Sequence, residues 1–75
     1  VDAVAAVIDE HARGAPVFVR LPYSSNLSRV TASWLSVRLP GVEITAAPRG
    51  DAPDMPSGSL WVWTDNETAR WRRVQ

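Results

Sequence analysis

VFVRLPYSSNLSRVTASWLSVRLPGVEITA, residues 17–46, is the stretch that decides the fold. Residues 17–21 are short, β-branched and apolar at almost every position, which predicts a strand covered on both faces, and Pro22 ends it. Apolar side chains then recur at spacings of three, four and three, as on one face of a helix, at Leu27, Val30, Trp34 and Val37. Residues 42–46 alternate apolar and polar, which indicates a strand with one buried face. The stretch therefore predicts a compact, parallel, right-handed βαβ unit.

A helix is predicted before this unit, over residues 2–13. Asp2 is an acceptable N-cap and Gly14 suits the position after the helix end. Apolar residues recur at helical spacing between them, at Val4, Val7, Ile8 and Ala12.

After the unit, residues 48–58 form an irregular loop that contains three prolines and two glycines. Residues 60–64 are predicted to form a third strand. Two interpretations remain for residues 65–74: a helix opened by a capping box at Thr64 and Glu67, or a four-residue hairpin loop at 65–68 followed by a returning strand. We favour the hairpin, because Trp71 and Val74 alone give a helix too small an apolar face.

The predicted fold is therefore a single α/β domain over residues 1–75, with two layers or three small ones and the element order α-β-α-β-β-β. The same periodicities predict one contiguous core in which Trp34 is buried. Its members are expected to be Val7, Ile8, Val17, Val19, Val30, Trp34, Ile44 and Val62.

Composition limits the function classes. The chain has 75 residues with eight basic residues, all of them Arg, and eight acidic residues, so its formal charge is zero, which disfavours strong nonspecific nucleic-acid binding. It lacks cysteine, which excludes disulfides, thiolate zinc sites and cysteine nucleophiles and predicts a cytoplasmic location. No apolar run approaches the roughly 20 residues of a membrane span, so no membrane partner is expected. No metal, cofactor or complete catalytic constellation is predicted, and the chain is not expected to be an enzyme.

The hairpin supplies the leading candidate site. Its predicted register pairs Thr64 with Ala69 and Val62 with Trp71. Strand alternation then gathers four residues on one face of the sheet: Trp61, Trp63, Arg70 and Arg72. Trp and Arg dominate protein–protein hot spots, and they also stack on bases and bind phosphate. The alternative is structural, with the first helix packed over the two indole rings.

A second candidate is an anion site at the start of the central helix, where backbone amides and the helix dipole favour negative charge. Its residues would be Ser24, Ser25, Asn26, Arg29 and Arg49. The simpler interpretation is that the first three cap the helix and the arginines are solvated. His11, the single histidine, is expected at the edge of the buried helix face rather than in a metal site, and Asp51 and Asp54 are expected to be solvated loop charges.

The sequence thus favours a non-enzymatic interaction module that binds a protein partner or itself through the Trp/Arg hairpin. The first alternative is single-stranded nucleic-acid binding on the same face, and the second is an anion-binding or enzymatic domain that uses the helix start at Ser24–Asn26.

Overall fold

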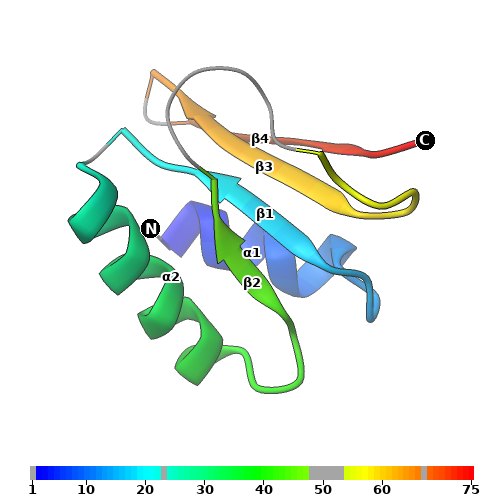
Figure 1. The fold of residues 1–75 in the computed structure, drawn as a ribbon, viewed down its shortest axis with the longest axis horizontal. Helices are drawn as coiled ribbons and strands as arrows, with labels where there is room; N and C mark the ends of the chain where they lie inside the picture. The colour runs from blue at the N-terminus through cyan, green and yellow to red at the C-terminus, as the bar shows by residue number, and fades with distance from the viewer. Residues whose placement is uncertain (1, 23, 48–53, 67) are drawn as a thin grey trace.

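The residues that the structure describes form two helices and a four-stranded mixed sheet (Figure 1). The structure, a computed structural model, describes residues 2–22, 24–47, 54–66 and 68–75. In chain order the elements are α1 (Asp2–His11), β1 (Val17–Arg20), α2 (Ser25–Arg38), β2 (Ile44–Ala46), β3 (Leu60–Asp65) and β4 (Thr68–Arg73). The strand order is β2-β1-β3-β4, with β1 parallel to both neighbours and β4 antiparallel to β3. The predicted α/β class, βαβ unit and C-terminal hairpin are confirmed.

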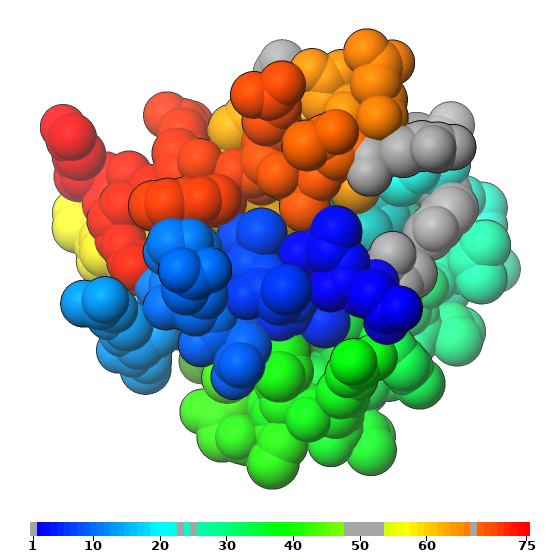
Figure 2. All heavy atoms as spheres, turned by 180° about the vertical axis from the view of Figure 1, so that it is seen from behind, coloured from blue at the N-terminus to red at the C-terminus, as the bar shows by residue number. Residues whose placement is uncertain are grey.

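The core lies between the sheet and both helices. On β1 and β3 the residues Val17, Val19, Leu60 and Val62 are at most 1% exposed, and their register places them on one face of the sheet. Val4 and Ile8 of α1 and Leu35 of α2 belong to the same buried cluster. Seen from behind, α1 lies in front of this face (Figure 2). The described residues therefore form two layers, and neither of their helices lies on the opposite face of the sheet.

Two element boundaries differ from the sequence prediction by two residues. α1 ends at His11 rather than Arg13, because Arg13 adopts a left-handed φ of 50° and Gly14 follows with a φ of 81°. β2 begins at Ile44 rather than Val42, because the Val42 amide donates to the Leu39 carbonyl at 3.3 Å and so belongs to the turn after α2.

The hairpin register is confirmed at every predicted pair, including Trp63 with Arg70 and Val62 with Trp71. The loop is shorter than predicted, because Asp65 and Thr68 also pair. Asn66, at the turn, has a φ of 48°, the left-handed conformation that tight hairpin turns require. The alternative helix over residues 66–74 is wrong, since residues 68–73 form β4.

The predicted orientation of α2 is wrong. Trp34 is 46% exposed and Val30 is 65% exposed, so neither belongs to the core. The other six predicted members are buried or packed against the core: Val7, Ile8, Val17, Val19, Ile44 and Val62. α2 turns a different stripe inward, made of smaller residues: Ser28, Ala32 and Leu35, with Leu39 following. Small side chains let a helix lie close to a sheet, and an indole ring at this contact would hold the two layers apart.

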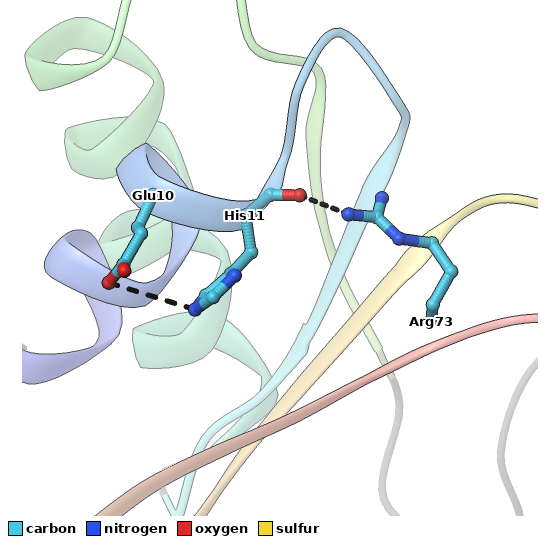
Figure 3. Close-up of polar contacts among 3 residues, drawn as sticks. All are labelled: Glu10, His11 and Arg73. Atoms are coloured by element: carbon cyan, nitrogen blue, oxygen red, sulfur yellow. Dashed lines mark hydrogen bonds and ion pairs between the residues drawn. The ribbon is translucent and has the colours of Figure 1, made fainter.

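Arg73 of β4 holds the end of α1 (Figure 3). Its guanidinium donates to the carbonyls of His11 and Ala12, which lie where a helix end leaves carbonyls without helical donors, and to the Gly58 carbonyl at 3.1 Å. One half-buried side chain therefore joins α1, the turn before β3 and the last strand.

Replacing Arg73 by methionine, which keeps the aliphatic stem, is expected to lower the free energy of unfolding by about 1–2 kcal/mol, since charge-assisted hydrogen bonds are lost at a partly exposed site. Urea denaturation measures this change. The matched control is Arg72→Met, an exposed neighbour on the opposite face, for which we expect a change below about 0.5 kcal/mol. Equal losses for the two variants would contradict the role given to Arg73.

Candidate functional site

The most unusual surface of the described structure is an apolar stripe on α2. We define the α2 stripe as Leu27, Val30, Trp34 and Val37, whose exposed fractions are 49%, 65%, 46% and 82%. Their spacings of three, four and three place them on one side of the helix, roughly opposite the buried Ser28, Ala32 and Leu35. Both sides of α2 thus carry apolar side chains, and the sheet covers only one of them.

The spacing of the α2 stripe predicts a helix face correctly, but the predicted core wrongly includes two of its members, Val30 and Trp34. The sequence also contains a second periodic stripe on the same stretch, which indicates that one of the two stripes faces away from the sheet. Ser28, Ala32, Leu35 and Leu39 recur at spacings of four, three and four and are small enough for close packing on the sheet. A helix with two such stripes has a second apolar face for another contact.

Local capping fixes the start of α2. Ser24 is the N-cap, and its side-chain oxygen accepts a hydrogen bond from the Leu27 amide at 3.3 Å. At the other end, the backbone amide of Leu39 donates to the Leu35 carbonyl. These caps set the first and last turns, from which Leu27 and Val37 project.

The charges of α2 are all positive. Arg38 lies with its guanidinium carbon 5.2 Å from the Trp34 ring centroid and forms an ion pair with Asp2 of α1 at 3.0 Å. Arg29 donates to the Asn26 side-chain oxygen at 3.1 Å. Asn26, Arg29, Val30 and Ser33 surround an open depression of about 410 Å³ beside the α2 stripe. The surface is therefore apolar along its centre, with a shallow hollow on one flank.

The predicted hairpin surface has the expected register but not the expected exposure. Trp61 is only 6% exposed, whereas Trp63 is half-buried and Arg70 and Arg72 are exposed. The Trp61 and Trp63 rings stack with centroids 6.4 Å apart, and the guanidinium above Trp61 belongs to Arg20 at 5.1 Å. α1 covers the other face of the sheet, so the alternative in which it packs over these rings is also wrong. Of the four predicted residues, three remain accessible to a partner.

The predicted anion site is brought together only in part. Ser24 caps the helix, and Asn26 and Arg29 bond to each other. Arg49 and the Ser25 side chain lie outside the described residues. These contacts match the simpler interpretation for Ser24, and the anion site stays a hypothesis.

His11 packs against β4. Its ring stacks on Trp71 with centroids 3.9 Å apart. Its Nε2 lies 3.7 Å from a Glu10 carboxylate oxygen (Figure 3). Within the part of the chain that the structure describes, no group of three His, Asp or Glu side chains comes together to hold a metal. Asp54 is exposed, as expected, and Asp51 lies outside the described residues.

Among the described helices, none is long and apolar enough to cross a membrane. Comparisons of the chain with protein-family models, curated proteins and solved structures found no match.

Proposed function

We propose that this domain is a non-enzymatic interaction module that docks on a protein surface, either a partner's or its own, through the α2 stripe. The observation that carries the proposal is the exposure of four large apolar side chains on one side of α2, between 46% and 82% each. Single exposed apolar residues are ordinary, but contiguous patches on soluble proteins commonly mark association surfaces.

The composition of the α2 stripe supports protein docking. Its spacing matches the narrow seam by which one helix packs against another, and Trp34 is of the residue type most enriched at binding hot spots. Small polar side chains flank it, at Ser33 and Asn26, and leave room for a neighbouring backbone. This favours a helical partner surface over an extended peptide or a small molecule.

Site-specific photo-crosslinking tests the proposal. A benzophenone side chain replaces Val37, the most exposed member of the α2 stripe, and the protein is irradiated in its native host. We expect a defined protein adduct from position 37. The same probe at exposed Ala3 of α1 is the control and should give none. A Val37 probe that forms no more adduct than the Ala3 probe would overturn docking through α2.

A second candidate is single-stranded nucleic-acid binding on the helix-free face. The specific observation is the pair of exposed guanidinium groups, Arg70 and Arg72, that flank the half-buried Trp63. A benzophenone at Arg70 would then crosslink to nucleic acid, and the affinity would fall steeply with salt, because phosphate contacts release counterions. A flat salt dependence would exclude this candidate.

A further inference from the structure

We infer that the occupant of the α2 stripe is a second copy of this chain, with the two α2 helices antiparallel across a two-fold axis. The inference rests on the proposed docking function and names its partner. The axis passes at the level of Ala32, the midpoint of the α2 stripe. Two features of α2 support this pairing, the order of its spacings and the hollow beside it, and its charges do not oppose it.

The spacings of the α2 stripe read the same in both directions: three, four, three. An antiparallel copy therefore aligns every member with another member, because Leu27 faces the second copy's Val37 and Val30 faces the second copy's Trp34. Each pair joins a larger side chain to a smaller one, which lets the two surfaces interdigitate. A two-fold contact requires such self-complementarity, and a heterologous partner does not.

The depression beside the α2 stripe can accept a side chain of the second copy. Asn26, Arg29, Val30 and Ser33 occupy positions i, i+3, i+4 and i+7, the four positions that form a hole for a knob from a facing helix. In the antiparallel pairing the side chain opposite this hole is the second copy's Trp34. A volume of about 410 Å³ accommodates an indole ring. The Arg29 guanidinium at its rim would contact the ring face.

Charge does not oppose the pairing. α2 contains two arginines and no acidic residue, so two copies bring like charges together. Arg38 is ion-paired with Asp2 at 3.0 Å, which offsets its charge. The other arginine, Arg29, points from the flank rather than from the α2 stripe. A contact held by apolar side chains and cation–π contacts is expected to persist in salt.

The surface area available for contact limits the expected affinity of the dimer. The exposed parts of the four side chains amount to roughly 400 Å² on each copy, and two copies with their flanks bury on the order of 1,000 Å², the lower limit for a specific interface. We therefore expect a reversible dimer with a dissociation constant in the micromolar range or weaker. Sedimentation should show the 8.2 kDa chain shifting to twice that mass as concentration rises.

Two charge variants test the geometry. Leu27→Glu creates a capping box with Ser24, and Val37→Lys places a positive charge in the last helical turn, so both changes favour the helix itself. Each variant alone is expected to weaken dimerisation by at least about 30-fold. An equimolar mixture should dimerise again, because the carboxylate introduced by Leu27→Glu then faces the ammonium group introduced by Val37→Lys in the other chain, while the second Leu27–Val37 pair stays intact.

The controls are Ala3→Glu and Thr45→Lys, which introduce the same charged side chains at exposed positions outside the α2 stripe, and both should dimerise like the unaltered chain. Rescue in the mixture supports the antiparallel dimer. Dimerisation of the unaltered chain without rescue overturns the antiparallel geometry. A chain that stays monomeric at millimolar concentration overturns the second copy as occupant. If its Val37 benzophenone then crosslinks to a different protein, the docking function stands while this inference fails.

Discussion

Replacing Leu35 by alanine is expected to lower the free energy of unfolding by about 2–5 kcal/mol, whereas replacing the adjacent Trp34 should lower it by only about 1 kcal/mol. Leu35 is fully buried between α2 and the sheet, so its truncation leaves a cavity in the core. The larger Trp34 is 46% exposed, and its loss removes partial packing and the contact with Arg38. The usual relation between side-chain size and stability loss is thus inverted at two neighbouring positions.

Urea denaturation of both variants at a concentration where the chain is monomeric measures the difference. A dilute sample is essential, because dimerisation would add a concentration-dependent contribution to the stability of the Trp34-containing protein. A Trp34→Ala variant that unfolds at lower urea than Leu35→Ala would mean that α2 turns its larger stripe inward, and it would remove the basis of the proposed function.

Replacing Trp61 by alanine is expected to lower the free energy of unfolding by about 3–5 kcal/mol, which is a large part of the total for a domain this small. Trp61 is only 6% exposed, and it lies beneath the Arg20 guanidinium and against the Trp63 ring, so a cavity forms where three side chains meet. The variant should melt well below the unaltered protein or fail to fold.

Trp71→Ala is the matched control, because it removes the same ring from β4 at a position that is 42% exposed. We expect it to lose less than half as much stability as Trp61→Ala, through the stack on His11. Thermal unfolding followed by far-ultraviolet circular dichroism measures both. An unchanged melting temperature for Trp61→Ala would mean that this ring lies at the surface, and the hairpin would again be the leading candidate binding site.

The hairpin shows which parts of this fold follow from sequence. Once Leu60 and Val62 are assigned to a buried face, strand alternation determines the face of the remaining residues of β3. The position of the turn then pairs Val62 with Trp71. The predicted loop length is wrong without any effect on register, because removing two residues from the loop adds one pair to the ladder.

Two features do not follow from local patterns. α2 has two apolar stripes, and the choice between them depends on how closely the helix must approach the sheet, which is a property of the assembled layers. Strand alternation predicts the correct face for Trp61, but the ring is only 6% exposed on that face, where the Arg20 guanidinium of β1 lies 5.1 Å from its centroid and the Trp63 ring stacks on it. A contact between side chains of two strands that are far apart in the sequence has no signature in the hydrophobic periodicity of either segment.

The Arg73 contacts affect when the domain can fold during its translation. Synthesis runs from the N-terminal side, so α1 leaves the ribosome before β4, yet a guanidinium 62 positions later completes the hydrogen bonding at the end of α1. Until β4 is free of the ribosome, the outer edge of β3 has no hydrogen-bonded neighbour. The nascent domain therefore gains its full set of stabilising contacts only after translation has passed Arg73, and it exposes an edge to other chains before then.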